Sequence, residues 1–254
     1  MTGRIIAWLL LFTLIGVIAY GVYSRRIDVP ERYDPFAPYD VRAPQGPFTV
    51  YKRWRTMHDP QLCEAALAES GLVYKPMADS VGAGGCALND VVRITQADDT
   101  RFSSPFLAMC PLALGIADFE HRYLQSAALE IFSERVTRIE HVGSYACRNV
   151  NHQQDTALSQ HASASAIDLT GFVLANGRRI TLARWNDEAT QDASFLQRVH
   201  EGACYYAFDT TLGPDYSALH KTHFHVDMGP YSIADERFVR MDASPINEIP
   251  EESE

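Results

Sequence analysis

The stretch at 167–182, IDLTGFVLANGRRITL, predicts a β-hairpin and decides the expected fold class. Two runs rich in apolar and β-branched residues, at 167–174 and 179–182, flank an Asn-Gly dipeptide at 176–177. Asn-Gly favours a tight turn between antiparallel strands, because both residues tolerate the positive φ angles that such turns need. With a further strand expected at 222–228, the C-terminal half is predicted to form antiparallel strands.

Helices are expected mainly before these strands. The longest helix should cover about 113–135, where apolar residues recur at three- and four-residue steps and would bury one face: Ile116, Phe119, Tyr123, Ala127 and Ile131. Asp59 before Pro60 predicts a capped helix at 60–70, and 195–199 is expected to be helical. This order predicts an α+β fold, a small antiparallel sheet with helices packed on one face.

The N-terminus carries a run without any charge at 5–23, IIAWLLLFTLIGVIAYGVY. Nineteen residues is about the length that crosses a bilayer as a helix. No small-x-small cleavage site follows it, which favours an uncleaved transmembrane anchor over a removed signal peptide. Residues 1–4 are then cytoplasmic, and the proline-rich stretch at 24–50 is interpreted as an extended spacer.

Charge narrows the class of partner. The net charge of -10 argues against nucleic acid, because phosphate binding needs clustered Lys and Arg. The soluble domain is expected at 51–240, followed by an acidic tail at 241–254 that is predicted to be disordered. No oligomeric state follows from the sequence.

The five cysteines are scattered and include no C-x-x-C pair, which makes a cysteine zinc site unexpected. Disulfides in an oxidising compartment are the favoured interpretation, with reduced buried thiols as the alternative. The preferred bridge joins Cys147 to Cys204, with a second among Cys63, Cys86 and Cys110. Anchor and cysteines together predict a single-pass protein whose C-terminal domain lies outside the membrane.

Two segments carry the chemistry: SQHASASAID at 159–168 and HKTHFHVD at 220–227. A strand directs alternate side chains to one face, so His223 and His225 should project together. Two imidazoles and one carboxylate, with an open fourth position for water, form the usual ligand set of a hydrolytic zinc site. A single histidine on a strand is more often structural, but three histidines within six residues favour a metal site.

These segments resemble a known clan. SQHASASAID is similar to the S-x-H-x-x-G-x-A-x-D signature of the D-alanyl-D-alanine metallopeptidase and Hedgehog clan, and HKTHFHVD resembles the H-x-x-H-x-H ending of its penicillin-insensitive murein endopeptidases. Four blocks together look like the bacterial extensin-like C-terminal family over about residues 50–230: GSYACRN at 143–149, the run at 161–172, Ala-Cys at 203–204, and 219–227. The resemblance implies a zinc-peptidase-like fold. Together with the anchor, it implies a single-pass protein of the bacterial inner membrane with a periplasmic C-terminal domain.

The resemblance also implies a role for each histidine and for one aspartate. His161, Asp168 and His225 would hold Zn²⁺. His220 or His223 would accept a proton from the attacking water, a task that suits a side chain titrating near neutrality. His223 is favoured as the base, because it should share a strand face with His225.

Three further residues complete the predicted site. Arg148 occupies a position where the clan keeps an arginine, which would hold a substrate carboxylate or stabilise an oxyanion; a structural ion pair is the alternative. Asp227 and Ser159 are expected to support the ligands from behind. Two departures from the clan stand out. Ala164 replaces the signature glycine where a positive φ is expected, and Thr222 stands where the dipeptidase branch has a glutamate base.

The resulting function prediction is a membrane-anchored zinc hydrolase that cleaves amide bonds in peptidoglycan or its stem peptides. The alternative is a non-catalytic wall-binding module that retains zinc, and a structural zinc in an interaction domain is a third possibility. The pair His220 and His223 favours the enzyme, because a binding module needs no general base.

Overall fold

A mixed sheet forms the centre of the domain in the computed structural model, which describes residues 2–150, 153, 156–187 and 189–229. Its strands follow the order β1-β4-β5-β6-β7-β10-β9, with β8 also paired to β7. Their bounds are β1 Leu72–Pro76, β4 Val91–Ala97, β5 Thr100–Met109, β6 Val136–His141, β7 Ala166–Leu174, β8 Arg179–Thr181, β9 Thr210–Leu212 and β10 Phe224–Asp227. Strands β2 (Ser80–Val81) and β3 (Ala87–Leu88) form a separate hairpin.

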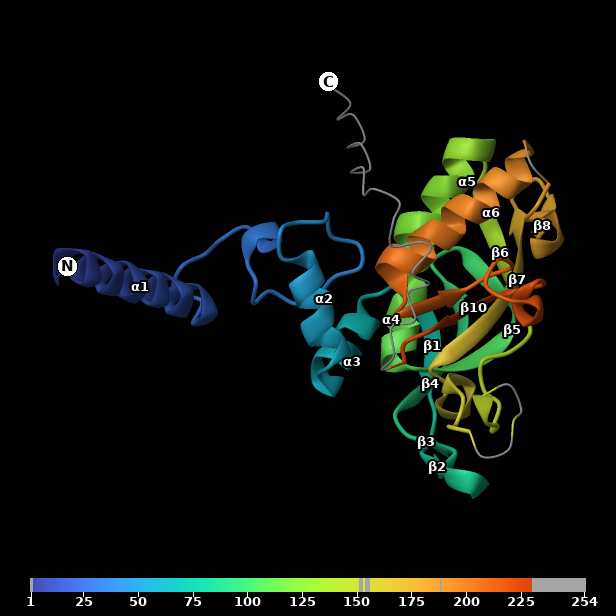
Figure 1. Ribbon diagram of the computed structural model, residues 1–254, viewed down its shortest axis with the longest axis horizontal. Coiled ribbons are helices and arrows are strands. Elements are labelled where there is room, and N and C mark those ends of the chain that lie inside the picture. The colour runs from blue at the N-terminus through green and yellow to red at the C-terminus, as the bar shows by residue number, and fades with distance from the viewer. Residues whose placement is uncertain (1, 151–152, 154–155, 188, 230–254) are drawn as a thin grey trace.

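The helices are distributed along the whole chain (Figure 1). The α-helices are α1 Thr2–Tyr23, α2 Thr49–Met57, α3 Pro60–Ala68, α4 Cys110–Asp118, α5 Gln125–Phe132 and α6 Gln191–Gly202. Two π-helical segments, η3 Phe119–Leu124 and η7 Ala203–Ala207, continue α4 and α6. The 3-10 turns are η1 Glu31–Tyr33, η2 Ala83–Gly85, η5 Gln160–Ser163, η6 Leu182–Arg184 and η8 Ala218–His220. The α+β class is therefore confirmed.

The expectation of a wholly antiparallel sheet is wrong at one pair of strands. β5 and β6 run parallel, with Phe102 opposite Ile139. A parallel pair needs a long crossover, and α4, η3 and α5 provide it between the end of β5 and the start of β6. The strands β1, β4 and β5 precede this crossover, so helices do not simply come first.

The long helix expected at about 113–135 runs from 110 to 132 as α4, η3 and α5. Its apolar face packs into the core beside α6 (Figure 1), with Ile116 and Phe119 fully buried. The expected cap is also present: Asp59 accepts hydrogen bonds from the amides of Gln61 and Leu62 at the start of α3.

The hairpin of β7 and β8 confirms the Asn-Gly prediction. Gly177 has a φ of 85°, and its amide donates to the carbonyl of Leu174 to close the turn. Positive φ is the conformation that only glycine and a few other residues adopt readily.

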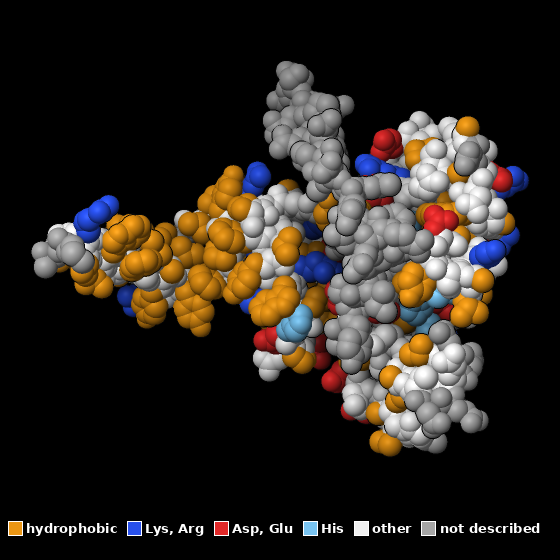
Figure 2. Space-filling model, in the orientation of Figure 1, with side chains coloured by type: hydrophobic (Ala, Val, Ile, Leu, Met, Phe, Trp, Pro, Cys, Tyr) orange, Lys and Arg blue, Asp and Glu red, His pale blue; other side chains and the backbone are white. Residues whose placement is uncertain are grey.

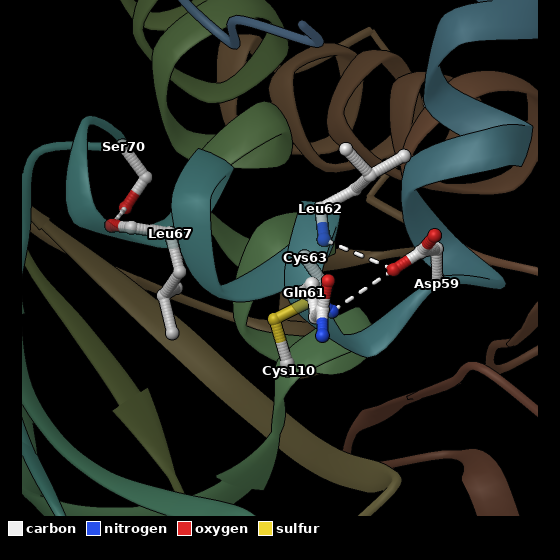
Figure 3. The surroundings of a disulfide bond; sticks show 7 residues. All are labelled: Asp59, Gln61, Leu62, Cys63, Leu67, Ser70 and Cys110. Carbon is white, nitrogen blue, oxygen red and sulfur yellow. Dashed lines mark hydrogen bonds between the residues drawn. A yellow bond between two sulfur atoms is a disulfide. The ribbon is translucent and has the colours of Figure 1, made fainter.

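Two disulfides stabilise the fold, and one predicted pairing is wrong. Cys63 of α3 bonds to Cys110 at the start of α4 (Figure 3), which confirms a bridge within the predicted set of three. Cys147 bonds to Cys86, between η2 and β3, and not to Cys204. Cys204 lies in η7, which continues α6 in the helical layer, whereas Cys147 lies in the loop after β6.

The proline-rich segment lies against the domain. Tyr39 and Val41 are buried in the main core, and the Tyr39 hydroxyl donates to the carboxylate of Asp118 in α4. Arg122 donates to the carbonyls of Asp40 and Ala43. The predicted end of the domain at 240 and the acidic tail at 241–254 lie outside the described residues.

α1 is long and apolar enough to span a membrane. Its window of highest hydropathy, within Gly3–Tyr23, averages 2.5, and only 11% of that window is buried within the protein. Exposed apolar residues in such a run are unfavourable in water, because each leaves hydrocarbon surface hydrated.

Candidate metal centre

The site is built on the paired strands β7 and β10. Their antiparallel register places His225 directly opposite Asp168, so both side chains leave the same face of the sheet. Phe224 and Val226, the neighbours of His225, are buried on the other face with exposures of 1% and 0%. Strand alternation therefore directs the imidazole and the carboxylate toward each other.

A tight turn brings His161 to the same place. In η5 the hydroxyl of Ser159 accepts a hydrogen bond from the amide of His161 at 3.3 Å, which caps the turn. The turn ends at Ala164 with a φ of 55°, so the expected positive φ at the signature position is confirmed. Ser159 thus shapes the backbone that carries His161.

Three imidazole nitrogens surround one carboxylate oxygen, Oδ1 of Asp168. Nδ1 of His225 lies 2.9 Å from it, Nε2 of His161 3.3 Å, and Nε2 of His223 3.7 Å. The candidate ligand atoms of His161, Asp168 and His225 all lie within 4.8 Å of one another, a spacing suited to holding a metal ion.

In His161 and His225, the ring nitrogen that points away from Asp168 also has a hydrogen-bond partner. Nδ1 of His161 lies 2.8 Å from the carbonyl oxygen of Ser144, and Nε2 of His225 lies 3.0 Å from Oδ2 of Asp227. Oδ1 of Asp227 accepts the amide of Gly229 at 2.8 Å. Such outer contacts fix ring orientation and tautomer, a common arrangement around metal-binding histidines.

His220 and His223 lie beside the cluster. The ring of His220 is 5.3 Å from that of His223 and 6.0 Å from that of His225. Nδ1 of His220 lies 2.8 Å from the hydroxyl of Ser217, which orients the ring. His223 precedes β10, and its Nε2 nevertheless points to the same carboxylate as His225.

Arg148 lies in the loop after β6, where its carbonyl accepts the amide of Ser159. Its charge is close enough to contribute to lowering the pKa of His223. Among the residues that the structure describes, no ion pair involves the Arg148 side chain.

The comparisons with known proteins identify the family. A match to the family described as extensin-like protein C-terminus covers residues 61–235, more than half of the chain. The chain belongs to the extensin-like C-terminal family. Searches of curated proteins and of solved structures gave no match. The matched span of this extensin-like domain includes every residue of the cluster described above.

Burial and hydrogen bonding act against each other in this extensin-like domain. Burial alone would raise the pKa of Asp168, but hydrogen bonds with His161 and His225 hold it well below its usual range. Burial would lower the pKa of His225, yet its contacts with Asp168 and Asp227 raise it to about 9. Burial and the neighbouring imidazoles lower the pKa of His220 to about 4.

Two residues that orient the imidazoles were not expected from the sequence. Ser144 acts through its carbonyl, which any residue type could supply, and only its place in the 143–149 block hinted at a role. Ser217 precedes His220 by three residues, and a local turn alone brings them together.

Proposed function

We propose that this extensin-like domain is a zinc-dependent hydrolase that cleaves amide bonds in peptidoglycan peptides. The observation that carries the proposal is the convergence of His161 Nε2 and His225 Nδ1 on Oδ1 of Asp168. The resemblance of both motifs to the D-alanyl-D-alanine metallopeptidase clan supports the same reading.

The donor set fits zinc. Two imidazoles and a carboxylate are common ligands of catalytic Zn²⁺, and three protein ligands leave one position for water. The contacts of His161 with the Ser144 carbonyl and of His225 with Asp227 fit the outer contacts of such ligands. When bound, Zn²⁺ lowers the pKa of a water to about 7 and polarises a carbonyl.

The other polar groups at the cluster would carry out proton transfer and substrate binding. His223 Nε2, 3.7 Å from Asp168 Oδ1, is placed to take a proton at the cluster and return it to the leaving amine. His220, oriented by Ser217, is the second candidate for this transfer. Arg148 would hold a substrate carboxylate or the developing oxyanion.

The proposed location is supported by the apolar helix α1 and by the two disulfides. α1 serves as an uncleaved anchor in the bacterial inner membrane, and the domain faces the periplasm. The two disulfides support an oxidising compartment. A wall-peptide substrate lies within reach of a domain held in this way.

The test uses the full-length protein, loaded with zinc and incubated with purified sacculi. New amine termini are expected in the soluble fraction. His225→Ala should lose both bound zinc and release, and His223→Ala should keep zinc and lose release. His121→Ala is the matched control, because His121 lies in η3 away from the cluster.

One outcome would count against the hydrolase, and another would change the assigned roles. Zinc-loaded protein that sediments with sacculi and releases no amine would identify a wall-binding module instead. Equal loss of zinc in His223→Ala and His225→Ala would make His223 a ligand and leave the proton transfer to His220.

A further inference from the structure

Helix α2 has its polar and apolar faces inverted relative to a helix on a water-exposed surface. Its basic residues point inward: the Lys52 side chain is buried, with its Nζ 3.2 Å from the carbonyl of Glu31. Arg55 donates to the carbonyls of Phe36 and Ala37 at 3.1 and 2.9 Å. A surface helix in water normally directs such charges outward.

The outward side of α2 is apolar. We call Phe48, Val50, Tyr51 and Trp54 the aromatic face. Their exposed fractions are 37%, 82%, 43% and 55%, and the rings of Tyr51 and Trp54 are 6.2 Å apart. A single exposed apolar side chain is ordinary, but a contiguous set opposite buried charges indicates a non-aqueous partner.

The segment between α1 and α2 packs against the end of α1. Tyr23 of α1 packs edge-on against Phe36 at 5.3 Å, and Arg25 forms an ion pair with the buried Asp34. Arg55 of α2 donates a hydrogen bond to the carbonyl of Phe36. In Figure 2, hydrophobic side chains continue from α1 toward this part of the surface.

We infer that the aromatic face lies in the interfacial layer of the membrane from which α1 emerges. The inference rests on the proposed anchor. Trp and Tyr favour the boundary between headgroups and acyl chains, where an apolar ring and a polar edge are both satisfied. The α2 cations are engaged within the protein, so apolar insertion and not charge attraction drives the contact.

This contact would fix the orientation of the domain. A flexible tether lets a domain rotate freely above a membrane, whereas a second contact beside the anchor restricts that rotation. Since Tyr39 and Arg122 also tie the intervening segment to α4, the restriction passes to the sheet that carries the histidines.

Tryptophan quenching in lipid vesicles tests the inference, because the chain has three tryptophans in three environments. Trp8 lies in α1, Trp54 in α2, and Trp185 is buried with an exposure of 5%. The full-length protein is reconstituted into phosphatidylcholine vesicles with or without bromine on the acyl chains near their carbonyl ends. Trp8→Phe leaves Trp54 and Trp185, Trp54→Phe leaves Trp8 and Trp185, and the double variant leaves Trp185 alone.

Brominated lipid should quench the Trp8→Phe variant more than the double variant, and adding anionic lipid should change this little. Equal quenching of those two variants would overturn the inference. The Trp54→Phe variant reports the anchor separately: quenching of Trp8 without quenching of Trp54 leaves the anchor standing, and loss of both removes the anchor itself.

The matched control adds Leu129→Trp to the double variant. Leu129 is 45% exposed and lies on α5, remote from α1 in Figure 1. Its tryptophan should escape quenching, and quenching as strong as that of Trp54 would overturn the inference. Shielding of Trp54 from iodide without quenching by brominated lipid would also overturn it, in favour of a protein partner such as a second copy of the chain.

Discussion

Asp168 and Asp118 are two poorly exposed carboxylates with opposite electrostatics. Imidazole nitrogens surround Asp168, and its pKa lies well below the usual range although burial opposes this. Asp118 contacts Tyr39, Arg53 and Arg122, yet burial outweighs these contacts and raises its pKa. The side chain of Asp168 is 15% exposed, and that of Asp118 is only 2% exposed.

The two sets of partners suit different roles: those of Asp168 suit a binding site, and those of Asp118 suit a structural contact. The partners of Asp168 are nitrogens that can bind either a proton or a metal, so they can exchange one ligand for another. The partners of Asp118 are two guanidinium groups and a phenol, which have no such chemistry at neutral pH. They fasten the proline-rich segment to α4.

The largest effect is expected from Asp168→Ala. Removal of the carboxylate takes away one of the three proposed ligands, so we expect loss of bound zinc, measured by metal analysis after gel filtration. Without the carboxylate, the imidazoles of His161 and His225 lose their shared partner, so the melting temperature of the metal-free protein should also fall, in line with the depressed pKa of Asp168. Retention of zinc would contradict the assigned site.

Asp118→Ala should differ from Asp168→Ala by sparing zinc binding. It leaves Arg53 and Arg122 without their shared buried carboxylate, which costs about 3–5 kcal/mol of unfolding free energy. Denaturant titration measures this, and zinc binding by the folded protein should persist. Asp192→Ala, which removes an ion pair with the exposed Arg178, is the control and should cost less than about 1 kcal/mol.

His200 sharpens the comparison, because it lies behind β10 while His225 lies in front. It packs on Trp185 and Phe224 at 5.4 and 5.1 Å, and burial lowers its pKa from 6.5 to about 4, against a smaller opposing effect of Asp215. Its neutral form stabilises the folded state, so this stability is present above pH 6.5 and is lost as the pH falls toward 4.

The loss attributable to His200 should be about 3 kcal/mol. The measurement is the unfolding free energy of metal-free protein between pH 7 and pH 4, compared with His200→Gln. The variant should lack this part of the pH dependence. Parallel curves for the two proteins would contradict a depressed pKa in the folded state.

Asp227→Asn tests the contact behind His225. The amide keeps the shape but loses the charge that holds Nε2, so zinc affinity should weaken by about 10–100-fold. Competition with a chelator of known affinity measures the change. An unchanged affinity would assign Asp227 to its hydrogen bond with the amide of Gly229 alone.

The smallest effect is expected from Ala164→Gly. Glycine adopts the φ of 55° without strain, a relief of about 1 kcal/mol, partly offset by the loss of a buried methyl group near Leu88 and Val91. Thermal unfolding should therefore show a small gain in stability. A marked loss would mean that the packing of this methyl group outweighs the backbone strain.

Local patterns predicted much of the fold. The amphipathic run that contains Ile116 and Phe119 is a helix, and the turn at Gly177 joins the expected hairpin. The strands between 72 and 109 are not among the expected elements, although Val92 and Ile94 alternate with polar residues in β4. Two bulges in the pairing of β1, β4 and β5 interrupt this period, which weakens the local signal.

The sequence by itself determined the local features and the candidate site residues. These are the apolar span at 5–23, the helix capped by Asp59, and His161, Asp168 and His225 in their two motifs. Their role as zinc ligands stays a prediction. These features depend on residues close along the chain, whose side-chain periodicity or turn chemistry can be recognised in the sequence before the fold is known.

Only the tertiary structure decided which distant residues meet. Cys147 pairs with Cys86 and not Cys204, and β5 lies parallel to β6. The register of β7 and β10 places His225 opposite Asp168, and Tyr39 reaches Asp118 across 79 residues of chain. Such contacts depend on strand order and helix packing, which minimise exposed apolar area over the whole domain and leave no local signature.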